Sequence, residues 1–172
     1  MAITMNGTTG ISGAPLQRGT EVATTSGTTV VFATNIPDWV SRVTVMLYGV
    51  STSGTSRPLI QFGTGGTPTY VTSGYASTSD NYSSTAGPVG TSTSGFVCGS
   101  TSTASSTWTV VYTFVCMGSN KWIGVIGGTT VASGVVIGGG YITLGAALTA
   151  LRLTTVNGTD TLDAGSVNYI YE

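Results

Sequence analysis

The segment TWTVVYTFVCM, residues Thr107–Met117, is dominated by β-branched and aromatic side chains, which favour extended strands. A second apolar run, Lys121–Ile126 (KWIGVI), begins after Gly118-Ser119-Asn120. Glycine and asparagine tolerate the positive φ angles of tight turns, so this spacing predicts two antiparallel strands joined by a hairpin. The pair indicates an all-β fold and guides the interpretation of the rest of the chain.

Short runs of similar composition recur along the chain, separated by clusters of Gly, Ser, Thr and Asn. Several alternate with a period of two: Val43, Val45 and Leu47 share one face of their run. No window shows the 3.6-residue stripe of an amphipathic helix. We therefore expect an all-β, jelly-roll-like β-sandwich. The predicted strands are Thr28–Ala33, Ser41–Val50, Leu59–Gly63, Tyr70–Gly74, Gly95–Gly99, Thr107–Met117, Lys121–Ile126, Tyr141–Leu144, Leu148–Thr155 and Ser166–Tyr171.

The composition excludes several classes of function. Of 172 residues, five are basic, six are acidic and none is histidine, so a Ser-His-Asp triad is excluded and few groups can move protons or hold a metal. We expect no enzyme activity and no cofactor. The net charge of −1 offers no basic footprint for nucleic acid. A near-neutral, β-rich surface favours self-association, so we expect a homo-oligomer.

The long uncharged segment Trp122–Leu151 contains eight glycines, which weaken a helix, so it does not predict a membrane span. The start of the chain, Met1–Gly7, has neither the basic nor the apolar region of a secretory signal. We therefore expect Cys98 and Cys116 to be reduced thiols. A cross-strand disulfide between them is the alternative in an oxidising compartment.

Three regions differ from the predicted strands. Residues 1–19 are expected to form an extended N-terminal arm, distinct from a β-sandwich domain at residues 20–172. Residues 51–58 form a loop rich in Ser, Thr and Gly, and residues 75–94 form the longest polar stretch, which we interpret as a long loop.

Several segments, in the same order along the chain, resemble a module of bacteriophage tail-fibre and other virion proteins. The resemblance covers the leader and most of the chain from Thr20 to Glu172. The segments that carry it are Ala2–Ile11 (AITMNGTTGI), Ile36–Met46 (IPDWVSRVTVM), Gly49–Ser56 (GVSTSGTS), Leu59–Gly65 (LIQFGTG) and Leu151–Glu172 (LRLTTVNGTDTLDAGSVNYIYE).

The resemblance implies a structural protein of the phage particle, assembled in the host cytoplasm and most often trimeric. Its partners would be further copies of itself, other virion proteins and a host surface glycan or protein. Ile3, Met5 and Ile11 are candidates for docking the arm on the virion or on a neighbouring subunit, because an extended arm can add a strand to a sheet edge.

Three hypotheses remain open from the sequence. A short tail-fibre or receptor-binding module would expose tyrosine-bearing loops at its distal end. A capsid decoration protein would be present in high copy number and would not bind the host. A carbohydrate-active enzyme would need two carboxylates across a cleft, and the scarcity of acidic residues disfavours it.

Among single residues, Tyr70, Tyr75 and Tyr82 lie in or near polar segments, where a tyrosine ring beside small hydroxyl groups suits recognition of a host receptor. Ordinary loop packing is the alternative for these tyrosines. The tryptophans of the chain are adjacent to apolar residues and are expected in the core or at an interface. They are Trp39, Trp108 and Trp122.

The charged residues give two further candidates. Arg42, Arg57 and Arg152 either face solvent on strands or pair across subunits with Asp38, Asp160 or Asp163. Asp160 and Asp163 follow an Asn157-Gly158 turn, and we interpret them as part of a self-bonded hairpin, with a calcium loop as the alternative.

Overall fold

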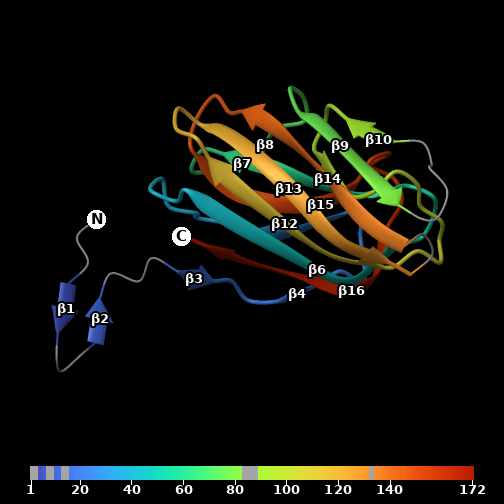
Figure 1. The fold of residues 1–172 in the computed structure, drawn as a ribbon, viewed down its shortest axis with the longest axis horizontal. Coiled ribbons are helices and arrows are strands. Elements are labelled where there is room, and N and C mark those ends of the chain that lie inside the picture. The colour runs from blue at the N-terminus through green and yellow to red at the C-terminus, as the bar shows by residue number, and fades with distance from the viewer. Residues whose placement is uncertain (1–3, 7–9, 13–15, 83–88, 132–133) are drawn as a thin grey trace.

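The structure, a computed structural model, describes residues 4–6, 10–12, 16–82, 89–131 and 134–172. Within these ranges the regular structure consists of sixteen β-strands and no helix (Figure 1). The strands form antiparallel sheets of two, nine and five strands. The nine- and five-stranded sheets pack against each other, so the predicted all-β sandwich is confirmed.

The larger sheet has the strand order β10-β9-β14-β13-β12-β6-β16-β3, and β4 also pairs with β16. Its central strands are long, whereas its edge strands β10, β3 and β4 have two or three residues. The bounds are β3 (Gln17–Arg18), β4 (Val22–Ala23), β6 (Arg42–Thr52), β9 (Ala76–Tyr82), β10 (Gly90–Ser92), β12 (Trp108–Cys116), β13 (Lys121–Thr130), β14 (Gly134–Thr143) and β16 (Leu162–Tyr171).

The smaller sheet has the order β11-β7-β15-β5, with β8 paired to β7. Its bounds are β5 (Thr29–Ala33), β7 (Pro58–Thr64), β8 (Thr69–Tyr70), β11 (Phe96–Val97) and β15 (Leu148–Thr155). The remaining strands, β1 (Thr4–Asn6) and β2 (Gly10–Ser12), pair with each other in a two-stranded sheet beyond β3 (Figure 1).

The predicted central hairpin is confirmed. Strands β12 and β13 pair without interruption from Trp108 opposite Thr130 to Cys116 opposite Trp122. The turn closes where the amide of Met117 donates to the carbonyl oxygen of Lys121 at 2.8 Å. Ser119 and Asn120 occupy the left-handed region there, with φ angles of 50° and 55°.

Aromatic rings from both sheets fill the space between them. Phe62 of β7 lies with its ring centroid 5.0 Å from that of Phe114 on β12 and 5.7 Å from that of Trp122 on β13. The Phe96 ring of β11 lies 4.7 Å from Phe114. These side chains are buried, and edge-to-face contacts add to the free energy gained by removing their surface from water.

One prediction about the chain's organisation was wrong. The segment 75–94, interpreted as a loop, contains strands β9 and β10 in its described part. The arm at residues 1–19 stays a prediction, and in the structure β3 at Gln17–Arg18 pairs with β16. The predicted loop at residues 51–58 connects two strands but is shorter in the structure, because β6 runs to Thr52 and β7 begins at Pro58.

Strand β9 pairs with β10 and β14, and its polar side chains supply hydrogen-bond partners for the backbone of residues 97–100. Ser77, Ser79 and Asn81 alternate on its buried side. The amide of Val97 donates to Ser77 Oγ at 3.0 Å, and the amide of Gly99 donates to Ser79 Oγ at 2.9 Å. Buried backbone groups need such partners, so hydroxyl side chains are suited to this position.

Candidate interaction surface

The outer face of β12, β13 and β14, which points away from the smaller sheet, exposes a row of large apolar side chains. On β12 the inward residues Trp108, Val110, Tyr112 and Phe114 are at most 2% exposed. The side chains that alternate with these on the outer face are apolar too. The outward apolar residues of the three strands are Val111 (45% exposed), Val115 (44%), Ile123 (43%), Val125 (57%), Val135 (48%), Ile137 (51%) and Tyr141 (61%).

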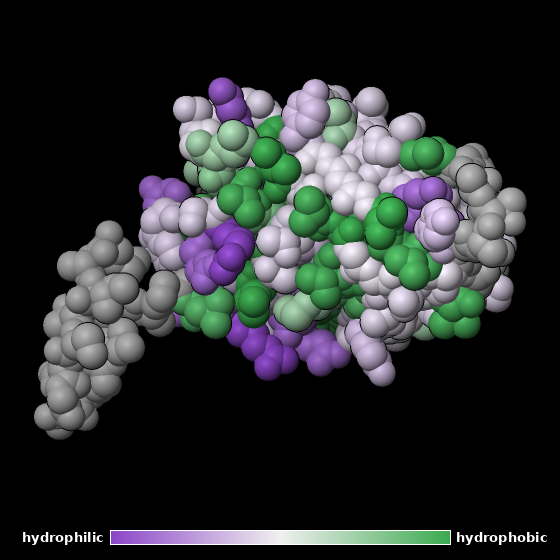
Figure 2. Space-filling model, viewed as in Figure 1, coloured by the Kyte–Doolittle hydropathy of each residue, from purple (hydrophilic) through white to green (hydrophobic). Residues whose placement is uncertain are grey.

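We call these seven residues the apolar face. In Figure 2 green, apolar side chains are spread across the side of the molecule that carries these strands in Figure 1. Soluble monomers rarely expose a continuous apolar patch larger than a few hundred square ångströms, and larger patches mark interaction sites. The seven side chains of the apolar face are each 43–61% exposed and lie on three paired strands.

Glycines alternate with bulky residues on the apolar face. In the pairing of β12, β13 and β14, Gly127 lies opposite Val111 on one side and Ile137 on the other, and Gly139 lies opposite Val125. A side chain at Gly127 would stand in open space. A shallow hollow of about 550 Å³ adjoins this region, lined in part by Met117, Ile123, Val125, Gly139 and Tyr141.

The strands on both sides of the apolar face add polar residues to its border. On β9 the outward positions include Thr78 and Asp80 beside Tyr82, and on β6 they include Arg42 and Thr44 beside Met46. Across the described length of β12, β13 and β14, Lys121 beside the hairpin is the one charged residue. An apolar centre with a polar rim is the arrangement found in protein interfaces.

The outer face of the smaller sheet is organised differently. Arg152 of β15 lies opposite Gln61 of β7, and its Nε donates to Gln61 Oε1 at 2.7 Å. Gln61 Nε2 in turn donates to the carbonyl oxygen of Ser94 at 2.7 Å. The Arg152 guanidinium also covers the ring of Tyr70. Here the polar side chains bond to one another, and Val31 opposite Arg152 is exposed beside them.

The structure separates the three tyrosines predicted to contact a receptor. Tyr75 is 3% exposed, and its hydroxyl oxygen accepts a hydrogen bond from the amide of Phe62 at 2.9 Å, so its predicted receptor role was wrong. Burial raises the pKa of Tyr75 to about 12. Tyr70 is half-buried beneath Arg152, whereas Tyr82 is 59% exposed on β9 and stays a candidate contact.

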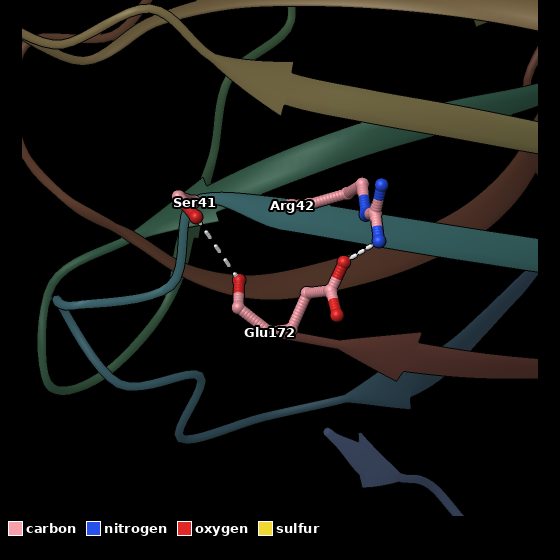
Figure 3. Close-up of polar contacts among 3 residues, drawn as sticks. All are labelled: Ser41, Arg42 and Glu172. Atoms are coloured by element: carbon pink, nitrogen blue, oxygen red, sulfur yellow. Dashed lines mark hydrogen bonds and ion pairs between the residues drawn. The ribbon is translucent and has the colours of Figure 1, made fainter. Parts of the chain in front are cut away.

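The three arginines have partners within the chain. Arg42 on β6 forms an ion pair with Glu172, and Ser41 Oγ donates to the carbonyl oxygen of Glu172 at 3.3 Å (Figure 3). Arg57 Nη1 donates to the carbonyl oxygen of Gly99 at 3.1 Å. These contacts anchor loops and strand ends, and the predicted pairing across subunits stays a prediction.

The acidic hairpin is held by its own hydrogen bonds. Asp160 Oδ2 accepts from the amide of Ser56 at 2.8 Å, and Asp160 Oδ1 accepts from Asn157 Nδ2 at 2.8 Å. Asn157 first and then Ser56 hold the pKa of Asp160 below its ordinary value. Asp163 accepts from Ser51 on β6. Within the described residues no group of three or more Cys, Asp or Glu side chains is arranged to hold a metal.

The tryptophans and cysteines differ in how deeply the fold buries them. Trp108 and Trp122 are buried as predicted, while Trp39 is 42% exposed and stacks at a tilt on Tyr171. Cys98 and Cys116 are free thiols, and burial raises the pKa of Cys98 far above its usual range. The predicted reduced state agrees with this arrangement.

Of the three arm residues predicted to dock, Ile3 lies outside the described residues. Met5 and Ile11 lie opposite each other in the pairing of β1 with β2. Among the described parts of the chain, no helix has the length and hydropathy needed to cross a membrane.

No family model matches the sequence, and no curated protein matches it. Among solved structures, a crystal structure of a protein of unknown function from Shewanella oneidensis MR-1 is similar, with 9% sequence identity and a TM-score of 0.37. The match covers 97% of this chain and 82% of that chain. A likeness at this level assigns neither a family nor a function.

Proposed function

We propose that this protein is a non-enzymatic structural subunit of a bacteriophage particle, of the short tail-fibre or receptor-binding kind. The observation that carries the proposal is the apolar face, because an exposed apolar surface of this kind is suited to contact with a macromolecule. The segments that resemble virion proteins, such as Ile36–Met46, supply the biological setting. The subunit functions as a homo-oligomer, and a trimer is the expected state.

A role as a capsid decoration protein is the second candidate. It is favoured by the environment of the predicted receptor tyrosines: Tyr75 is buried and Tyr70 is covered by Arg152. Tyr82 alone of the three is widely exposed. A tyrosine-bearing receptor loop therefore has less support than the particle-bound role itself.

The test is a count of this protein in purified particles of the phage that encodes it, by mass spectrometry against calibrated peptides. We expect a few copies per particle for a tail component, whereas a number that matches the capsid lattice would favour decoration. Absence from washed particles would overturn the proposal. Release of reducing sugars from host surface polysaccharide by the purified protein would overturn its non-enzymatic part.

A further inference from the structure

We infer that the apolar face of β12, β13 and β14 is the surface through which copies of this chain bind one another. The inference names the partner of the surface described above and rests on the homo-oligomeric state in the proposed function. The occupant is a second copy of the same chain, and in a trimer the three faces meet around the threefold axis. Four observations lead to this occupant.

The first observation is the pattern of the strands. In β12 the residues Val110 and Val111 are both apolar although they point to opposite sides of the sheet, and Val125 and Ile126 in β13 repeat this. Continuous apolar runs of this kind are typical of strands that are covered on both faces. The smaller sheet covers one face, and no described part of the chain covers the other.

The second observation is the charge. The outward positions of the three strands contain one charged residue, Lys121, at the hairpin end of their described length. The chain as a whole has a net charge of −1, so copies repel one another weakly. A membrane surface would be bound by a face rich in basic residues, and a glycan by a face rich in hydrogen-bonding groups, and this face has neither composition.

The third observation is the shape of the face, on which large and small residues alternate. Ile137 lies opposite Gly127, where a side chain would stand in open space, and Val125 lies opposite Gly139, which lines the hollow. Large and small residues that alternate in this way let two layers interdigitate. A surface that carries both protrusions and gaps can place its protrusions in the gaps of a neighbouring copy.

The fourth observation is the size of the face. Its seven side chains lie on three paired strands and are each 43–61% exposed. A stable protein interface buries about 800 Å² on each partner, of which the centre is the most apolar part. The face supplies such an apolar centre, and the flanking strands β6 and β9 would extend the contact around it.

The experiment compares full-length wild type with Val125→Lys and with a matched control, Val31→Lys, by sedimentation equilibrium over a range of concentrations. Val31 is 46% exposed on β5 of the smaller sheet, close to the 57% of Val125. We expect wild type and Val31→Lys to form the same oligomer. Val125→Lys should raise the dissociation constant by more than ~100-fold, because it would bury an unpaired charge.

Circular dichroism checks that each variant folds, and hydroxyl-radical footprinting of the wild-type protein supplies a measurement that needs no variant. Val125 should be protected from modification in the oligomer while Val31 is modified. A monomeric wild type would overturn both the interface and the proposed oligomer. An oligomer in which Val125 is reactive, or which survives Val125→Lys, would overturn the interface alone. A Val125-dependent oligomer that is absent from phage particles would uphold the interface and overturn the proposed function.

Discussion

The guanidinium group of Arg152 lies over the ring of Tyr70, with its central carbon 4.4 Å from the ring centroid. From the sequence, Arg152 is a candidate for pairing with a neighbouring subunit, and Tyr70 is a candidate for contact with a receptor. In the fold they are partners of each other, and Gln61 completes the group by accepting a hydrogen bond from Arg152. The role of this cluster within the chain can be tested.

Arg152→Ala should lower the stability of the protein and leave its oligomeric mass unchanged. The change removes the cation–π contact and leaves the buried Gln61 Oε1 without its donor, which together cost about 1–3 kcal/mol of unfolding free energy. Urea unfolding and light scattering measure the two effects. Arg18→Ala, at an exposed position on β3, is the control and should change stability by less than ~0.5 kcal/mol. Dissociation of the oligomer by Arg152→Ala would show that Arg152 bridges subunits.

Tyr75→Phe should destabilise the fold by about 1–3 kcal/mol, because the amide of Phe62 then loses its buried hydrogen-bond acceptor. The same substitution at Tyr82, which is 59% exposed, should change the unfolding free energy little. Chemical denaturation of the two variants measures this difference. Equal stability of both variants would contradict the buried hydrogen bond of Tyr75.

Stability should fall at high pH. The folded-state pKa of Tyr75 is raised by burial to about 12, and burial also raises the pKa of Tyr112 well above its ordinary value. The unfolded chain releases these protons near pH ~10, so ionisation there favours unfolding. The stability that Tyr75 contributes is thus complete below pH ~10 and is lost by about 2 kcal/mol toward pH ~12.

Thermal melting at a series of pH values measures this loss. The melting temperature should stay level through neutral pH and drop above pH ~10. Absorbance at the tyrosinate band should show that Tyr75 and Tyr112 ionise together with the cooperative transition, because burial raises the pKa of both groups in the folded state. Ionisation of all tyrosines before unfolding would contradict the prediction.

Gly99→Ala should be strongly destabilising. Gly99 has a φ of +70°, and a Cβ there would overlap Asn81 Oδ1 and lie 2.5 Å from the ring of Trp108. Left-handed strain and overpacking together cost about 2–4 kcal/mol. Gly66→Ala is the matched control, because a side chain there meets open space. Unfolding free energies that fall equally for both variants would contradict the close packing around Gly99.

The sequence predicted the fold class because its strongest strands carry a local signal. Segments such as Thr107–Met117 combine β-branched residues with turn residues at both ends, and these preferences agree with the final fold. Strand β9 was missed because Ser77, Ser79 and Asn81 are strand-forming only where the backbone of residues 97–101 needs hydrogen-bond partners. That need arises from tertiary contacts.

The candidate surface was missed for a related reason. The predicted strands Thr107–Met117 and Lys121–Ile126 do not by themselves show which of their two faces points toward the core. The usable signal was the presence of Val110 and Val111 side by side, which indicates that both faces are covered. The burial of Tyr75 had no comparable signal, because polar neighbours in the sequence do not show which groups meet in space.

The pairing of Gln17 on β3 with Tyr171 on β16 has a mechanical consequence. Force applied between these two residues would pull across the hydrogen bonds of the pair and load them one after another, so β3 would peel away under a small tension. A load carried along β12 and β13 would instead shear many bonds at once. An assembly tethered through its N-terminal side would therefore yield first at β3 and keep its sandwich intact.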